Sequence, residues 1–308
     1  MVAVVGPTAT GKTALAVRLA ARFGGEVVNA DSRQVYRGMA IGTAQPAEAE
    51  RAAAPHHLFA VVEPDQPFSL GLYLDLAGRT LAEIWARGHV PFLVGGTGQY
   101  VWALLEGWQV PRVPPAPAVR AALEERARRE GAAALHRELA AVDPETAARI
   151  HPHNVHRVIR ALEVYRATGQ PPSRQRARRP PGFRALVLGL TCDRTELYRR
   201  IDARVEAMYA AGLVEEVRDL LARGYGRDLP AMRSIGYREA AAYLAGELTL
   251  AEAVARTKTE THRLARTQEA WFRRSDPRIH WLDCRRPDGA EALVRRFLEE
   301  GEPGERTA

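Results

Sequence analysis

The chain has 308 residues, of which 46% are hydrophobic and 26% are charged, and its formal net charge is +7. This composition is that of a globular protein, and no apolar run approaches the ~20 residues that a membrane span needs. The two cysteines, Cys192 and Cys284, are too few for a four-ligand zinc site and do not indicate a disulfide scaffold. We therefore expect a protein of the reducing cytoplasm without a membrane partner, and we take it to be a monomer.

The first third of the chain alternates between strand and helix patterns. In chain order these are a strand over 1–5, a helix over 12–23, a strand over 25–31, a helix over 71–88, a strand over 90–96 and a helix over 98–107. This alternation predicts an α/β fold in which helices cover both faces of a parallel sheet.

A basic segment interrupts this pattern. The prolines of 111–117 end it, residues 118–168 have a helical pattern, and 169–182 form a linker rich in proline and arginine. Residues 111–182 hold 14 arginines against 7 acidic residues, so this segment carries the whole net charge of +7. One basic segment on an otherwise neutral chain favours a polyanionic partner, although a solvated helical surface would have the same composition.

The α/β pattern returns after the basic segment. The predicted elements are strands over 184–192 and 278–284 and helices over 194–211, 213–224, 234–245, 249–274 and 286–299. We therefore predict an α/β catalytic core formed by 1–112 and 183–308, interrupted by a helical insertion domain over 113–182 that contacts the polyanion.

The sequence GPTATGKT lies between the first strand and the first helix, which is the context of a P-loop. Its residues are Gly6, Pro7, Thr8, Ala9, Thr10, Gly11, Lys12 and Thr13. The loop N–H groups and the helix N-terminus bind phosphate, Lys12 reaches phosphate oxygens, and Thr13 is placed to ligate Mg²⁺. Lys12 is one of only two lysines among 44 basic residues, so the position requires an ammonium group. The core is thus of the P-loop NTPase-like type, with the phosphate still unidentified.

An acidic residue follows the second strand. Asp31 lies at the carboxyl end of a parallel strand, where α/β sheets bind ligands, and it serves either as a second metal acid or as a general base. The strand over 90–96 is followed by no acid in GGTG, which argues against a switch NTPase.

Several longer stretches resemble the tRNA dimethylallyltransferases, also called tRNA isopentenyltransferases. They are DSRQVYRGMAIGTAQP (31–46), APHHL (54–58), VGGTGQY (94–100), RIHPHNVHRVIRALEVYRATG (149–169), RSIGYRE (233–239) and THRLARTQEAWFR (261–273). They occur in the family's order, and no Cys/His cluster follows them, which matches the bacterial type. The resemblance implies a fold similar to that of P-loop kinases, with a helical insertion that holds tRNA.

The resemblance also implies the reaction. The phosphate is then the diphosphate of dimethylallyl diphosphate, which leaves as the dimethylallyl group moves to N6 of the adenosine 3′ of the anticodon. Lys12, Thr13 with Mg²⁺ and the loop N–H groups would neutralise the departing diphosphate, and Asp31 would accept the amine proton. Thr97 would contact the diphosphate or the tRNA backbone.

The family pattern also implies contacts with the tRNA anticodon stem-loop. They involve Asp31, Ser32, Arg33, Gln34, Thr97, Arg120, His156, Arg157, Arg160, Arg233, Ser234, Gly236, Tyr237 and Arg238. Gln34 would read an adenine edge through paired donor and acceptor contacts, and Tyr237 would stack on a splayed loop. The target adenosine has to leave its stack to reach the diphosphate.

The chain departs from the family pattern at several positions. These are Gln45, where the family has lysine, then His153, Asn154 and His156, and finally Thr267, where the family has a basic residue. We expect these departures to alter the binding of tRNA, and none of them lies in the phosphate loop.

Two other functions stay open on the sequence. One is the same transfer onto free adenylate, against which the basic segment argues because a free nucleotide needs no polyanion clasp. The other is a small-molecule kinase, which would consume ATP and would give no reason for the arginine-rich segment.

Overall fold

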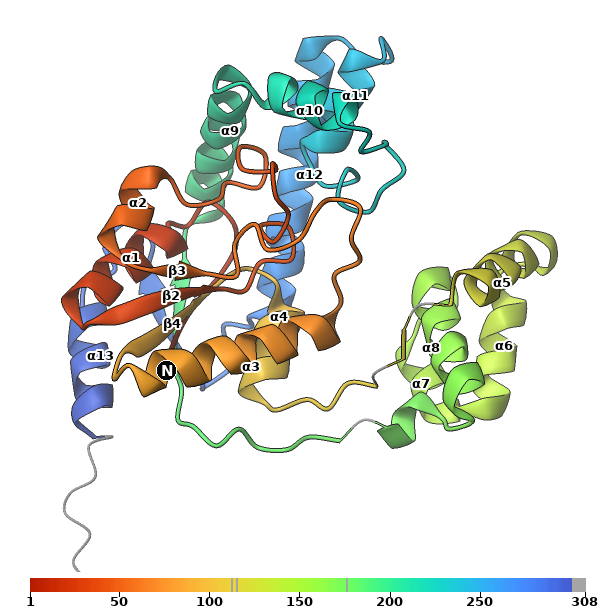
Figure 1. The fold of residues 1–308 in the computed structure, drawn as a ribbon, viewed down its shortest axis with the longest axis horizontal. Coiled ribbons are helices and arrows are strands. Elements are labelled where there is room, and N and C mark those ends of the chain that lie inside the picture. The colour runs from red at the N-terminus through yellow and green to blue at the C-terminus, as the bar shows by residue number, and fades with distance from the viewer. Residues whose placement is uncertain (112, 115, 176, 301–308) are drawn as a thin grey trace, which may run out of the picture. The chain divides into compact units, whose positions relative to one another are not determined.

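A computed structural model describes residues 1–111, 113–114, 116–175 and 177–300 (Figure 1). The chain divides into two compact units, which are Met1–Leu105 with the chain from Gly182 onward, and Glu106–Pro181. The second unit begins before position 113, where the insertion was predicted to begin. The reason is that its two connecting segments pair, with Arg179 N donating to Gly107 O at 2.9 Å and Gln109 N to Ala177 O at 2.8 Å.

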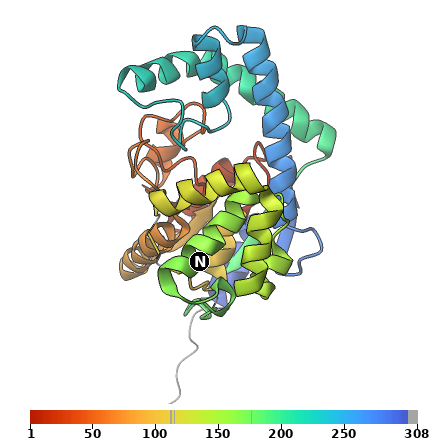
Figure 2. The same cartoon turned by 90° about the vertical axis from the view of Figure 1, so that its right-hand side faces the viewer.

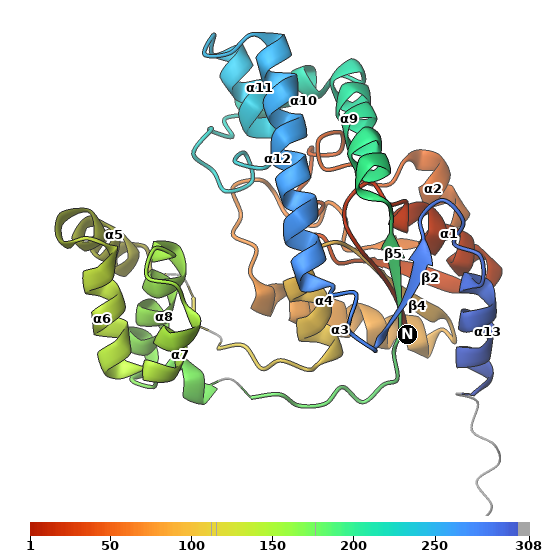
Figure 3. The same ribbon diagram turned by 180° about the vertical axis from the view of Figure 1, so that it is seen from behind.

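The first unit is built on a six-stranded sheet in the order β3-β2-β4-β1-β5-β6, with every neighbouring pair parallel (Figure 3). The strands are β1 (Val2–Val5), β2 (Gly25–Asn29), β3 (His56–His57), β4 (Val90–Val94), β5 (Leu186–Thr191) and β6 (Ile279–Asp283). Strands β1 and β2 are buried at every residue, because helices cover both faces of the sheet. The predicted α/β class is therefore confirmed.

Nine helices accompany this sheet in the described part of the first unit. They are α1 (Lys12–Arg22), α2 (Glu48–Ala53), α3 (Leu70–Ala86), α4 (Gly98–Leu105), α9 (Arg194–Ala210), α10 (Leu213–Ala222), α11 (Tyr237–Leu244), α12 (Leu250–Trp271) and α13 (Ala290–Glu299). Helix α1 packs Leu15 and Leu19 into the core formed with the strands. Helices α9 and α12 lie side by side, joined by ion pairs of Lys258 with Glu206 and of His262 with Asp202 (Figure 3).

The second unit is helical throughout its regular structure (Figure 2). Its elements are α5 (Pro117–Glu130), α6 (Ala132–Val142), α7 (Pro144–Arg149), α8 (Val155–Thr168) and a 3-10 turn over Pro172–Gln175. A small core of buried leucines, among them Leu123, Leu135 and Leu162, holds the helices together. Helices α5, α6 and α8 contribute apolar stripes at a spacing of three to four residues, as amphipathic helices do.

Several elements differ from the sequence prediction, and four of the differences have a clear local cause. Strand β3 and helix α2 were not predicted, because two residues and six residues are too short to produce a periodic pattern. Helix α11 begins at Tyr237 rather than 234, since Gly236 has a φ of 88°. Helix α13 begins at Ala290 rather than 286, since Gly289 has a φ of 85°. A glycine in this left-handed region is a natural helix boundary.

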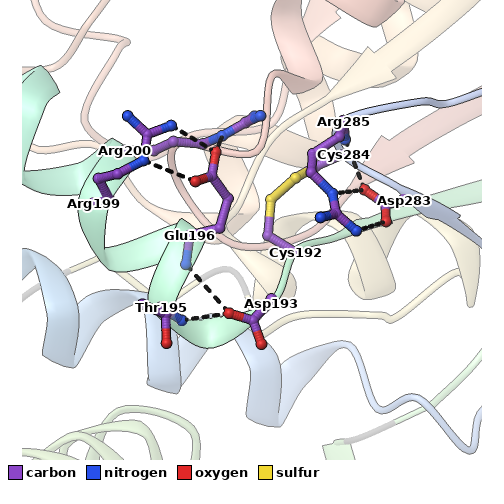
Figure 4. A network of polar contacts seen from close by, with 9 residues as sticks. All are labelled: Cys192, Asp193, Thr195, Glu196, Arg199, Arg200, Asp283, Cys284 and Arg285. Carbon is purple, nitrogen blue, oxygen red and sulfur yellow. Dashed lines mark hydrogen bonds and ion pairs between the residues drawn. A yellow bond between two sulfur atoms is a disulfide. The ribbon is translucent and has the colours of Figure 1, made fainter.

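The two cysteines form a disulfide, contrary to the expectation drawn from their number (Figure 4). Cys192 directly follows β5 and Cys284 directly follows β6, and these strands are paired neighbours. The strand register therefore brings the two Cα atoms to 5.4 Å, although 92 positions separate them along the chain. Cys284 N also donates to Thr191 O at 2.8 Å, which continues the strand pairing up to the bond.

Within the described residues, no helix combines the length and the apolar character that crossing a membrane requires.

Candidate phosphate and transfer site

The phosphate loop connects β1 to α1 at the carboxyl edge of the sheet. Gly6 has a φ of 135°, and a Cβ there would lie 2.4 Å from Leu190 O, so only glycine fits against β5. Gly11 precedes α1 with a φ of 86°, and Ala9 also adopts a left-handed conformation with a φ of 63°. The loop is therefore held in a tight curve directly before a helix N-terminus, where backbone N–H groups bind anions.

Lys12 is folded back onto this loop, with its Nζ donating to Pro7 O at 2.8 Å. Burial and the nearby charge of Arg204 lower the pKa of Lys12 to about 8, and the carboxylate of Asp31 opposes that shift. Burial also lowers the pKa of Arg204, and Asp31 again opposes the change. Two cations from α1 and α9 thus share one region with the carboxylate of Asp31, and the charge of Glu50 also acts on Arg204. An anion bound there would relieve the repulsion between the cations.

Sequence reasoning missed Arg204. The chain has 44 basic residues, of which only two are lysine, so one more arginine in a helix carries no signal of its own. Its place beside Lys12 becomes evident only when α9 is packed in three dimensions.

Asp31 follows β2 in a turn that is bonded on several sides. Its Oδ1 accepts from Arg33 N at 2.8 Å. Thr97, directly before α4, accepts at Oγ1 from Ser32 N at 3.0 Å and donates from its own N to Ala30 O at 3.2 Å. Through these two hydrogen bonds, Thr97 stabilises the turn that carries Asp31. A contact of Thr97 with the diphosphate stays a prediction.

Gln268 of α12 connects the phosphate loop to the GGTG turn. Its Oε1 accepts from Thr8 N at 2.7 Å, and a Cβ at Gly96 would lie 2.1 Å from its Nε2. The side chain is 6% exposed. In the sequence, Gln268 is only one residue of the family-like stretch over 261–273, so its role was not predicted.

The amide of Gln34 is engaged within the protein. Its Nε2 donates to Thr43 O at 3.0 Å and to Ala44 O at 2.7 Å. A paired reading of an adenine edge would require these bonds to break, so only Oε1 is available without rearrangement. Gln45 supports the same segment, since its Nε2 donates to Gln34 O and Tyr36 O, both at 3.0 Å. The departure from lysine at position 45 thus serves the packing of this loop.

In the second unit, Arg120 and Arg160 bind a buried carboxylate. Arg120 lies 3.0 Å and Arg160 2.7 Å from Oε2 of Glu163, whose side chain is 0% exposed. Burial alone would raise the pKa of Glu163, but the Ala116 amide and the two guanidinium groups outweigh it and hold this pKa below its usual value. These two arginines therefore have a structural role, whatever they contribute to RNA binding.

Other arginines of the second unit are exposed without an ion pair within the described residues. They are Arg137, Arg157, Arg174 and Arg179. Arg157 and His156 lie exposed on the first turn of α8, where Asn154 caps the helix by accepting from Arg157 N at 3.3 Å. Asn154 thus serves as the cap of α8.

The turn over Arg233–Arg238 is mostly buried. Ser234 Oγ donates to Ala231 O at 2.5 Å, and Gly236 N donates to Glu239 at 2.7 Å. Tyr237 is fully buried and its hydroxyl donates to Glu216 at 2.5 Å, so the expectation that its ring stacks on RNA is wrong. Tyr237 instead fills the core between α10 and α11. Only the arginines at the two ends of the turn are exposed, and Arg238 is paired with Glu239 and Glu260.

The residues present fit a magnesium ion held together with substrate. The described residues contain no group of three or more His, Cys, Asp or Glu side chains that could hold a metal by themselves. The half-exposed hydroxyl of Thr13, on the first turn of α1, is a hard oxygen donor beside the phosphate loop. Mg²⁺ commonly takes few protein ligands and completes its shell with substrate phosphates and water.

Comparisons with known proteins identify the family of this chain. The family model described as IPP transferase matches residues 34–275, and the model described as Isopentenyl transferase matches residues 1–55. A tRNA dimethylallyltransferase of Roseiflexus sp. (strain RS-1) is 60% identical over 302 residues, which cover 97% of this chain and 99% of that protein. A tRNA dimethylallyltransferase of Thermomicrobium roseum is 53% identical over 303 residues, covering 97% of this chain and 92% of that protein.

Two solved structures have a similar fold. The tRNA isopentenylpyrophosphate transferase of Bacillus halodurans superposes with a TM-score of 0.70 at 40% identity, covering 97% of this chain and 95% of that one. A eukaryotic dimethylallyltransferase acting on tRNA superposes with a TM-score of 0.80 at 27% identity, covering 97% of this chain and 79% of that one.

The fold and the loop define an enzyme of the P-loop NTPase-like α/β class. Within that class, the chain belongs to the IPP transferase family, and it is a prenyltransferase.

Proposed function

We propose that the chain transfers a dimethylallyl group from dimethylallyl diphosphate to N6 of the adenosine 3′ of the anticodon in tRNA, releasing diphosphate. The observation that carries this proposal is the phosphate loop with Lys12 folded onto it, with the charges of Arg204 and Asp31 nearby. An allylic diphosphate needs cations around its leaving oxygens, and an aromatic amine needs a carboxylate for its proton. The comparisons favour this function over transfer to free adenylate and over a kinase, because the relatives reported above are named for tRNA.

The reaction breaks one bond and forms another at the same carbon. The C–O bond to the diphosphate breaks, and its electron pair stays on the diphosphate. Lys12, Arg204 and the loop N–H groups neutralise that charge. The lone pair of N6 forms the new C–N bond, and Asp31 accepts the proton that N6 loses. Mg²⁺, when held by Thr13 and the substrate, adds positive charge on the diphosphate oxygens.

We assign the binding of tRNA to exposed arginines that occur in both units. Arg157 with His156 in the second unit and Arg233 in the first unit are exposed, and no ion pair within the described residues occupies them. Cations of this kind bind phosphates of the anticodon stem-loop and make the affinity depend on salt. A tRNA substrate is consistent with a monomeric enzyme of the cytoplasm.

A label-transfer assay tests the proposed function. Purified full-length protein with Mg²⁺ and labelled dimethylallyl diphosphate is offered unmodified tRNA, free AMP, or ATP with neither acceptor. We expect label on tRNA alone, at the adenosine 3′ of the anticodon, with no ATP turnover. Label on AMP would overturn the tRNA as acceptor, and ATP turnover without label transfer would overturn the prenyl donor.

A further inference from the structure

A buried amide lies directly behind the turn that carries Asp31. Asn29 is the last residue of β2 and is 0% exposed. Its Oδ1 accepts from Asp31 N at 2.9 Å, and its Nδ2 donates to Asp31 O at 3.0 Å and to Leu58 O at 3.0 Å. One side chain therefore holds the backbone of Asp31 from both its N–H and its carbonyl.

These bonds also orient the carboxylate of Asp31. With its backbone fixed, the Asp31 side chain turns so that Oδ1 accepts from Arg33 N at 2.8 Å. No hydrogen bond to Oδ2 is found among the residues that the structure describes. One carboxylate oxygen is thus engaged in fixing the turn, and the other is available to accept a proton.

Asn29 is itself held firmly. Its backbone carbonyl accepts from Tyr73 Oη at 3.1 Å, and the Tyr73 ring stacks on Tyr100 with the centroids 4.0 Å apart. Leu58, whose carbonyl accepts from Nδ2, has a φ of 65°, so its backbone is bent towards the amide. A fully buried amide costs free energy unless its donors and acceptor are bonded, and here all of them are.

We propose that Asn29 is a positioning residue for the transfer reaction, which sets the Asp31 carboxylate for accepting the N6 proton. This inference rests on the proposed function, because it assumes that Asp31 is the base. Asn29 touches no substrate in this scheme and acts through Asp31 alone. An alanine at position 29 would release both backbone bonds, and the carboxylate would sample orientations in which Oδ2 no longer faces the amine.

The experiment is a double-mutant cycle on the full-length enzyme. Asn29→Ala should lower kcat by roughly 10- to 100-fold, as expected for a misplaced catalytic group, with the KM for dimethylallyl diphosphate and the Kd for tRNA within twofold of wild type. Asp31→Asn should lower kcat by about 10²- to 10⁴-fold. Adding Asn29→Ala to Asp31→Asn should cost less than about twofold more, because there is no longer a base to position.

Matched variants separate positioning from simple support of the fold. Tyr73→Phe removes the bond to the Asn29 carbonyl and leaves the Asn29 amide in place, so kcat should stay near wild type. Asn29→Ser keeps a hydroxyl oxygen as acceptor for Asp31 N, loses both Nδ2 donors and buries no charge, and it should lower kcat by about 10-fold while the protein stays folded. It also serves if the alanine variant fails to fold, which thermal unfolding would reveal.

The outcomes distinguish the role of Asn29 as a positioning residue from the role of Asp31 as the base. If Asp31→Asn is severely impaired but the folded variants at position 29 keep wild-type kcat, the role of Asn29 is overturned and the base assignment stands. An equal loss from Asn29→Ala in both backgrounds would also overturn it, because a purely structural defect is additive. Wild-type kcat in Asp31→Asn would overturn the proposed base, and the inference with it.

Discussion

The two units of the molecule use their charged side chains in different ways. In the first unit, Lys12 is buried near Arg204 without an ion pair to any described residue, and burial together with the charge of Arg204 lowers the pKa of Lys12 to about 8 although Asp31 opposes the shift. In the second unit, arginines are mostly matched with carboxylates, as Arg120 and Arg160 are with Glu163. Unrelieved repulsion marks a site made for a ligand, whereas matched pairs mark a scaffold. Charge count alone does not separate the two.

The largest expected effect concerns the carboxylate of the first unit. Asp31→Ala should reduce transfer by about 10²- to 10⁴-fold, because it removes the base, while tRNA binding stays close to wild type. Single-turnover label transfer and a filter-binding titration of tRNA measure the two quantities separately. Unchanged turnover would mean that this unit binds the diphosphate but does not activate the amine through Asp31.

The next prediction tests the repulsion between Lys12 and Arg204 through the pH dependence of diphosphate binding. The pKa of Lys12 is about 8, below its ordinary value of 10.5, so raising the pH through 8 removes the ammonium from the free enzyme. The affinity for inorganic diphosphate should therefore fall by up to about 10-fold per pH unit above pH 8. Calorimetric titrations between pH 7 and 9.5 measure this slope.

The control for that titration is Lys12→Arg, which keeps its charge over the whole range. Its pH slope reports the ionisation of the ligand alone, and the wild-type slope should exceed it. Equal slopes in the two proteins would contradict the lowered pKa of Lys12.

A smaller effect is expected from an unmatched arginine of the second unit. Arg157→Ala should raise the Kd for tRNA by about 3- to 10-fold at low salt and reduce the salt slope by about one. Its free energy of unfolding should stay within about 0.5 kcal/mol of wild type, because the side chain is exposed. A Kd and a salt slope equal to those of wild type would remove Arg157 from the proposed interface.

The opposite result is expected from a matched arginine. Arg120→Ala should lower the free energy of unfolding by about 1–3 kcal/mol, because the buried Glu163 loses one of its two guanidinium partners. Arg128→Ala is the control, since Arg128 pairs at the surface with Glu125 and should cost less than about 1 kcal/mol. Urea unfolding of the full chain compares them. If both variants unfold alike, the pair with the buried Glu163 stabilises the fold no more than a surface pair does, and its role as a scaffold is contradicted.

Local patterns were enough to predict the parallel sheet, the phosphate loop and the position of Asp31 just after a strand. Each depends on a few consecutive residues, such as the buried run before Gly6 and the glycines that precede Lys12. The helices of the second unit were predictable for the same reason, because alanine-rich amphipathic stretches have a clear period.

Contacts between distant parts of the chain were not predictable. Arg204 reaches Lys12 only through the packing of α9, and Gln268 reaches Thr8 across 260 positions. Tyr237 is a second case, since a tyrosine between two arginines is compatible with a surface, and only the packing of α10 and α11 buries it. Asn29 likewise has the ordinary sequence context of a strand end.

The disulfide between Cys192 and Cys284 gives the chain a covalent topology of its own. The bond closes a ring that contains α9, α10, α11 and α12, and with them Arg204, Arg233 and Gln268. A protease that cuts an exposed loop inside this ring leaves a single molecule, because the disulfide still joins the two fragments at the sheet edge. For a ring of this size, the restriction of the unfolded chain favours the folded state by roughly 4–5 kcal/mol. Reduction would release the helices as an ordinary linear segment, held only by packing and strand pairing.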